Sequence, residues 1–222
     1  AKLTREIEDD DVIDFLVRIL TLDFAAPEDQ ATAFEFATRF QQTTGPIMAK
    51  AIEDTAFYRF NPMIGLNEVG SHLDEGERTP RDFHTAMEER RTTQRAGLST
   101  TSTHDTKRGE DARARLYALS EMPDTWVEAA GSWSATLRGE SGGNEATAID
   151  RESEWLFYQT LAAAWPTELL PSDDDGLAAL SQRIAEFMHK AVREAKMHTS
   201  WTAPDASYES AVQQFVASAL DS

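Results

Sequence analysis

Apolar residues recur three and four positions apart along most of this sequence, and this spacing constrains the fold more than any other feature. The longest such stripe runs from Leu177 to Ala195, and shorter ones lie within residues 12–20 and 208–216. Side chains at this spacing lie on one face of an α-helix. We therefore predict a mainly α-helical chain. Further helices are predicted at residues 28–40, residues 82–95 and after Gly109, with helix breaks at Pro27 and Gly45-Pro46.

Two short runs favour strands over helices. Ile47–Ala49 is apolar, and Leu98–Thr103 is rich in β-branched and small residues. The two runs lie about fifty residues apart with predicted helix between them, which is typical of a parallel β-α-β crossover. Two parallel strands do not form a stable sheet alone, so these strands would need partners that this sequence does not supply. The predicted fold is mainly α with a minor β component.

Composition excludes several classes of function. Apolar residues make up 41% of the chain and charged residues 27%, as in a globular protein. The net charge of −18 would repel phosphate backbones and anionic lipids, so we expect neither a nucleic-acid partner nor a membrane partner. No apolar run approaches the roughly 20 residues of a membrane helix. The absence of cysteine excludes disulfides and thiolate chemistry. These features favour a cytoplasmic protein.

Ionisable residues crowd the segment that follows the second predicted strand. His104, Asp105, Lys107 and Arg108 precede a predicted helix. Catalytic residues of α/β proteins gather at the carboxyl ends of strands. Cations at a helix N-terminus also oppose the helix dipole, and such a broken rule often marks a site. The alternative is that Asp105 caps the helix and the cations pair with acidic residues of its first turn.

A second segment, Met48–Arg59, follows the first predicted strand. If the two strands are parallel neighbours, its charged residues would lie on the same rim as His104 and Asp105. The alternative is a helix start at which Glu53, Asp54 and Arg59 are surface charges.

The remaining candidates indicate no cofactor or metal. The other histidines lack the spacing of a metal site, and no Gly-rich phosphate loop or Gly-x-Ser-x-Gly elbow is present. The tryptophans could stack on sugar rings, although in a helical chain they more often pack in the core. They are Trp126, Trp133, Trp155, Trp165 and Trp201.

Two long segments resemble sequence signatures of the malto-oligosyltrehalose synthases. They are Phe40–Arg59 and Ser102–Asp111, and shorter similarities lie at 66–70, 155–161 and 193–201. This resemblance implies a (β/α)8-barrel enzyme of the α-amylase superfamily. Such enzymes convert the reducing-end α-1,4 bond of a maltodextrin into an α,α-1,1 bond by intramolecular transglycosylation with retention.

The resemblance also implies roles for individual residues. Retention needs two carboxyl groups roughly 5 Å apart, a nucleophile and an acid/base. The superfamily adds a third carboxylate, preceded by His, which binds sugar hydroxyls and supports the transition state. His104 and Asp105 resemble that pair, so Asp105 is the implied catalytic residue. Lys50, Lys107 and, more weakly, Arg108 resemble family residues that bind the substrate.

Residues 1–222 contain neither the nucleophile motif nor the acid/base motif of the superfamily. The resemblance therefore implies a barrel fragment with about strands six and seven and helical insertions, inactive alone. The expected segments are 1–45, a helical lead into the barrel; 46–120, with both strands and the site motifs; and 121–222, a helical insertion. Expected partners are a malto-oligosaccharide, the rest of the parent chain and a second copy bound through exposed barrel edges.

A function of another class stays open. A non-catalytic helical carbohydrate-binding or scaffold domain would use the tryptophans and the acidic C-terminal half as its binding surface. Substitution of Asp105 by Asn would leave the function of such a domain unchanged.

Overall fold

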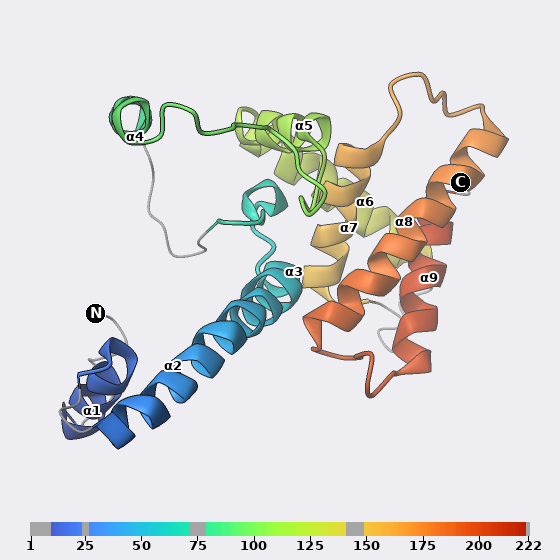
Figure 1. Cartoon of the computed structure of the whole chain (residues 1–222). Coiled ribbons are helices and arrows are strands. Elements are labelled where there is room, and N and C mark those ends of the chain that lie inside the picture. Colours follow the sequence, from blue (N-terminus) through green and yellow to red (C-terminus); the bar gives the residue numbers. More distant parts are fainter. Residues whose placement is uncertain (1–9, 24–26, 72–78, 141–148, 221–222) are drawn as a thin grey trace. The chain divides into compact units, whose positions relative to one another are not determined.

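The computed structural model describes the chain except for residues 1–9, 24–26, 72–78, 141–148 and 221–222 (Figure 1). The chain divides into two compact units, residues 1–52 and 53–222, and each is described by itself. None of the described helices is long and apolar enough to cross a bilayer.

The N-terminal unit contains helices α1 (Asp10–Thr21) and α2 (Pro27–Met48), which pack against each other. Ala33 and Ala37 lie one turn apart on α2 and are buried, so small side chains occupy the same face of this helix. Helix α2 continues through Gly45 and Pro46, so the predicted break there is wrong. Proline removes one backbone donor, but its fixed φ is helical, and the chain proceeds into the π-helix η2 (Ala49–Ala56).

The C-terminal unit contains helices of varied length around one core. Its elements are α3 (Phe57–Arg59), η3 (Ile64–Leu66), α4 (Pro80–Thr93), α5 (Glu110–Ser120), α6 (Pro123–Glu140), α7 (Arg151–Ala164), α8 (Asp174–Ala195) and α9 (Ala206–Leu220). Helices α8 and α9 lie side by side, and α7 packs against α8 and α5 (Figure 1). The predicted helices over 82–95, 177–195 and 208–216, and after Gly109, are confirmed.

The core of the C-terminal unit forms where α7 meets its neighbours. Phe157 on α7 is fully buried and makes edge-to-face contacts with Tyr158 and Phe215, with ring centroids 5.5 and 5.2 Å apart. The buried aliphatic side chains around α7 come from α5, α8 and α9. They include Leu116, Leu180, Ile184, Met188, Val212 and Val216.

Side chains cap several of these helices. Asp150 accepts a hydrogen bond from the Ser153 amide at the start of α7 (2.8 Å), and Asp173 accepts one from the Gly176 amide at the start of α8 (3.0 Å). Thr79 and Asp82 form a capping box on α4. These bonds satisfy amides that have no partner within the helix, which fixes where each helix begins.

The predicted minor β component is wrong, because the described residues contain no strand. Ile47 and Met48 belong to α2, where they extend the helical spacing of Phe36 and Phe40, and all four side chains are exposed. The barrel fragment with strands six and seven is therefore also wrong for the described part of the chain, and the barrel edges expected to pair two copies are absent from it.

The second predicted strand, residues 98–103, is irregular and exposed. Two of its hydroxyl groups bond to nearby backbone that a strand would pair with a neighbour: Thr100 donates to the Ser102 carbonyl at 2.7 Å, and Thr103 accepts from the Asp105 amide at 3.3 Å. Local bonds of this kind compete with a β ladder. Leu98, the apolar residue of the run, is 97% exposed and therefore gains nothing from burial.

An ion pair joins α8 to α9. Arg193 donates to both carboxylate oxygens of Glu209, from Nε to Oε1 at 2.8 Å and from Nη2 to Oε2 at 2.7 Å. Thr199 adds a third bond to Oε1. These bonds outweigh the effect of burial and lower the pKa of Glu209 to about 2. The carboxylate therefore stays charged in the folded protein well below the pH at which it protonates in the unfolded chain.

This shift makes stability depend on pH. A carboxyl pKa that is depressed on folding contributes stability above its unfolded value, about 4.5, and this contribution is lost as the pH falls towards 2. We expect Glu209→Gln to lower the free energy of unfolding at pH 7 by about 2–3 kcal/mol, and by less at pH 3. Urea unfolding of both proteins at the two pH values measures this. An equal difference at both pH values would contradict the assignment.

Candidate functional site around residues 104–108

The segment that contains His104 and Asp105 is a turn held by its own hydroxyl groups. Thr106 Oγ1 donates to the Thr103 carbonyl (2.7 Å) and accepts from the Thr103 amide (3.1 Å). The Asp105 amide donates to Thr103 Oγ1 at 3.3 Å. Both His104 and Asp105 are exposed. The turn therefore presents an imidazole and a carboxylate next to each other at the surface of the C-terminal unit.

Lys107 turns inward from this segment. Its Nζ lies 2.9 Å from Asp54 Oδ1, and the two side chains are only 16% and 23% exposed. Burial acts to lower the pKa of the Lys107 ammonium, but the hydrogen bond to Asp54 and the nearby negative charges, including Glu53, raise it overall. The ammonium therefore remains charged across the physiological range, with hydrogen atoms to donate.

Arg108 is held by the loop that contains η3. Its Nη1 donates to the Ile64 carbonyl at 3.0 Å, and its guanidinium lies 5.9 Å from the centroid of the Phe187 ring. Burial lowers the pKa of Arg108, but a guanidinium stays charged in proteins. Arg108 therefore fixes the 104–108 segment to both η3 and α8.

Glu68 connects the same loop to the backbone of the segment. It is 9% exposed, and its carboxylate accepts hydrogen bonds from the amides of Lys107 (2.7 Å, to Oε1) and Arg108 (3.2 Å, to Oε2). It also accepts from the Val69 amide at 2.8 Å and lies 3.5 Å from Arg113 Nη1 on α5. Sequence reasoning missed this residue as part of the site. An acidic residue flanked by Ile64, Leu66 and Val69 was the available signal for a buried carboxylate.

The structure contradicts the interpretation of this segment as a plain helix start. Gly109, and not Asp105, is the N-cap of α5, and it makes no side-chain cap. Lys107 and Arg108 contact Asp54 and the Ile64 carbonyl, not the acids of the first turn of α5. Asp54 is therefore not a plain surface charge.

Arg59, another charged residue of the second segment, bonds outside this cluster. Arg59 donates from Nε to the Ala195 carbonyl at 2.6 Å. Lys50 is exposed on η2 and belongs to the N-terminal unit. The structure thus joins Lys107 and Arg108 to Glu68 through their amides and pairs Lys107 with Asp54, with His104 and Asp105 on the adjoining turn.

Three of the tryptophans, Trp126, Trp133 and Trp155, pack against other aromatic rings. Trp126 contacts Trp133 and Trp155 at centroid distances of 5.8 and 5.7 Å, and Trp133 contacts Tyr158 at 5.6 Å. A mostly apolar hollow of about 450 Å³ lies beside this cluster, with Trp133, Tyr158 and Trp165 in its wall. The hollow is separate from residues 104–108, which do not line it.

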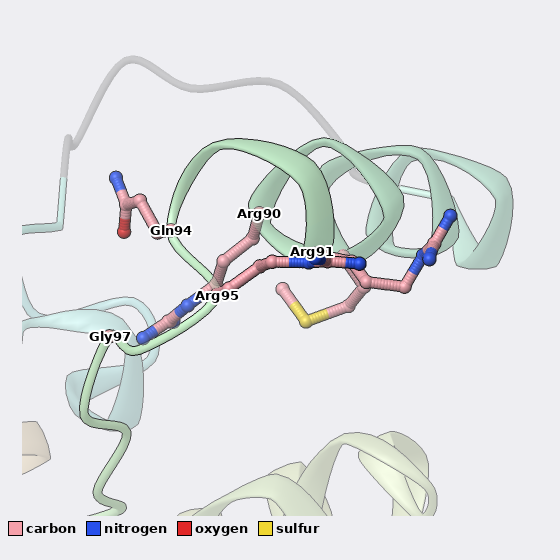
Figure 2. Close-up of a pocket in the computed structure, with 6 residues that line it drawn as sticks. Arg90, Arg91, Gln94, Arg95 and Gly97 are labelled. Carbon is pink, nitrogen blue, oxygen red and sulfur yellow. The ribbon is translucent and has the colours of Figure 1, made fainter.

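A second hollow, of about 430 Å³, lies at the end of α4 (Figure 2). Arg90, Arg91 and Arg95 line it, with Gln94 and Gly97 at the turn. Two of these guanidinium groups already have partners, because Arg91 binds Glu88 at 2.6 and 2.9 Å and Arg90 donates to the Leu98 carbonyl at 2.7 Å. None of the predicted site residues lines this hollow. Within the described residues, no group of three His, Asp or Glu side chains could hold a metal ion.

Known proteins resemble this chain over most of its length. A Mycobacterium tuberculosis protein named as a maltooligosyl trehalose synthase is 35% identical over 187 residues, which is 84% of this chain and 23% of that protein. A solved maltooligosyl trehalose synthase superposes with a TM-score of 0.70 and 33% identity, covering 87% of this chain and 25% of its own. The solved synthase of Arthrobacter ramosus gives a TM-score of 0.62 at 30% identity, covering 95% and 30%. No protein-family model matches.

The chain is related to part of the maltooligosyl trehalose synthases. Sequence and structure agree on this relationship, which confirms the resemblance seen in the two long segments. The chain spans about a quarter of the length of the synthases that it matches. In the described residues of this chain, every regular element of the matched region is a helix.

Proposed function

We propose that this chain supplies part of the active site of a malto-oligosyltrehalose synthase. The enzyme would convert the reducing-end α-1,4 bond of a malto-oligosaccharide into an α,α-1,1 bond by intramolecular transglycosylation with retention. The observation that carries this proposal is the anchored turn, in which Lys107 and Arg108 are fixed inward and His104 and Asp105 face outward.

Each of these side chains has chemistry that suits a sugar substrate. The Asp105 carboxylate can accept hydrogen bonds from sugar hydroxyls and stabilise the positive charge of an oxocarbenium-like transition state. His104 can bind a hydroxyl beside it. The Lys107 ammonium, kept charged by Asp54, can donate to a sugar oxygen. Lys50 and Arg108 are proposed substrate-binding residues on the resemblance alone.

Asp105 would not itself be the nucleophile or the acid/base. Retention requires both of those groups, and the resemblance assigns neither to these 222 residues. We therefore expect the chain alone to leave malto-oligosaccharides unchanged. With the whole synthase, maltopentaose would lose its reducing ends without release of glucose. Loss of reducing ends caused by the chain alone would contradict this expectation.

Lys107 provides a graded test of the site. We expect Lys107→Met, made in a whole synthase that contains this sequence, to lower kcat/KM about 10-fold, as expected for one charged hydrogen bond of about 1.5 kcal/mol. Methionine keeps much of the side-chain length and removes the charge. Lys190→Met, on the exposed side of α8, is the matched control and should change nothing. Unaltered kcat/KM in the Lys107 variant would exclude a role in substrate binding.

The apolar hollow favours a second function, the carbohydrate-binding or scaffold domain. Trp133 and Trp165 are suited to stack on sugar rings, although the hollow offers few polar groups for hydroxyls. Titration of the chain with maltopentaose, followed by tryptophan fluorescence, separates the two functions. Binding that is lost in Trp133→Ala and unchanged in Asp105→Asn would favour the carbohydrate-binding domain.

A further inference from the structure

Glu68 is not among the residues proposed to contact the substrate. Its carboxylate nevertheless joins the turn at residues 103–106 to the rest of the C-terminal unit. The hydroxyl bonds of Thr103 and Thr106 hold the turn together only internally. By contrast, the amides of Lys107 and Arg108 each donate to one oxygen of Glu68, at 2.7 and 3.2 Å. These are the backbone groups that follow Asp105 by two and three residues.

Glu68 can act as an anchor because its own position is fixed. Arg113 on α5 balances its charge at 3.5 Å, and both side chains are less than a fifth exposed. The loop that carries Glu68 is tied to α7, since Gln159 accepts from the Ile64 amide and donates to the Asn61 carbonyl, both at 2.9 Å. Gln159 is fully buried. A chain of bonds therefore runs from the core through Glu68 to the turn.

We propose that Glu68 is a positioning residue that orients Asp105 in the synthase. This inference rests on the proposed function. A carboxylate is required because two amides approach its two oxygens, and both oxygens must accept. Glutamine has the same shape but places an NH2 group against one of the amides, so one bond becomes a donor–donor contact. Aspartate keeps the charge but is one methylene too short to reach both amides.

The first test measures the anchor in this chain. In the wild type, the amides of Lys107 and Arg108 should be protected from hydrogen exchange, and in Glu68→Gln they should exchange at least about 10-fold faster. Amides in the middle of α8 should keep their rates. Unchanged exchange at Lys107 and Arg108 would overturn the inference whatever the enzyme assays show, and this measurement does not depend on the proposed function.

The second test measures positioning in a whole synthase that contains this sequence. Glu68→Gln should lower kcat 10- to 100-fold and change KM less than 3-fold. Combined with Asp105→Asn, it should cause no further loss, because a residue that acts through Asp105 has nothing left to position. Glu209→Gln, which also removes a carboxylate paired with arginine, should lower stability and leave kcat unchanged. If Glu68→Gln lowers kcat by the same factor in the wild type and in the Asp105→Asn variant, the inference is overturned.

Discussion

Asp105→Asn, made in a whole synthase that contains this sequence, is expected to lower kcat for trehalose-end formation about 10²- to 10³-fold, the cost of removing one preorganised electrostatic group. Asparagine has nearly the same shape and keeps one acceptor oxygen, but it carries no charge to oppose the cation that develops at the anomeric carbon. Because Asp105 is exposed and its amide, not its carboxylate, bonds to Thr103, the fold should not change.

The measurement is the initial rate at which maltopentaose loses reducing ends. Asp111→Asn, an exposed acid in the first turn of α5, is the matched control and should keep the wild-type rate. In the isolated chain, circular dichroism should give the same helicity for the wild type and for both variants. Full activity of the Asp105 variant would show that this carboxylate takes no part in the reaction. A carbohydrate-binding domain would then be the better interpretation.

The helices could be predicted because their periodicity is local. The apolar stripe from Leu177 to Ala195 lies within α8, where Leu180, Ile184 and Met188 are buried at spacings of four. Such a stripe is defined by residues only three or four positions apart, so it can be recognised in the sequence. Burial against α7 and α9 then stabilises the helix that the spacing predicts. The same reasoning holds for α1, whose apolar positions recur over residues 12–20.

The strands were predicted wrongly because short apolar or β-branched runs carry little information. Ile47 and Met48 fit a buried strand and a helix equally well, and only the continuation of α2 through Pro46 decides between them. Residues 98–103 have the composition of a strand. A strand, however, needs a neighbouring strand to complete its hydrogen bonds, and the described residues supply none.

The site could be predicted in part. The crowding of charge at 104–108 is visible in the sequence and indicates the segment. The partners are not visible, because Asp54 and Glu68 lie 53 and 39 positions away from Lys107. The spacing of residues in the sequence does not predict contacts over such separations. The contacts of Glu68 with this segment are therefore visible only in the structure.

Phe157→Ala is the substitution expected to cost the chain most stability. Phe157 is fully buried on α7 and contacts the rings of Tyr158 and Phe215, so its loss removes both apolar burial and two edge-to-face contacts. Side chains from α8 and α9 surround it and cannot all move to fill the space. We expect the free energy of unfolding to fall by about 3–5 kcal/mol, the range for truncation of a buried aromatic residue.

Urea unfolding followed by circular dichroism measures the loss. Phe83→Ala on α4 is the matched control, because it deletes the same atoms from a side chain that is 59% exposed, and its cost should stay below about 0.5 kcal/mol. Similar losses for the two variants would mean that α7 does not lie at the centre of a packed core. A loss confined to Phe157→Ala would show that α7 lies at the centre of a packed core in the C-terminal unit. The same helix is bonded to the loop of Glu68, since α7 supplies Gln159 to that loop.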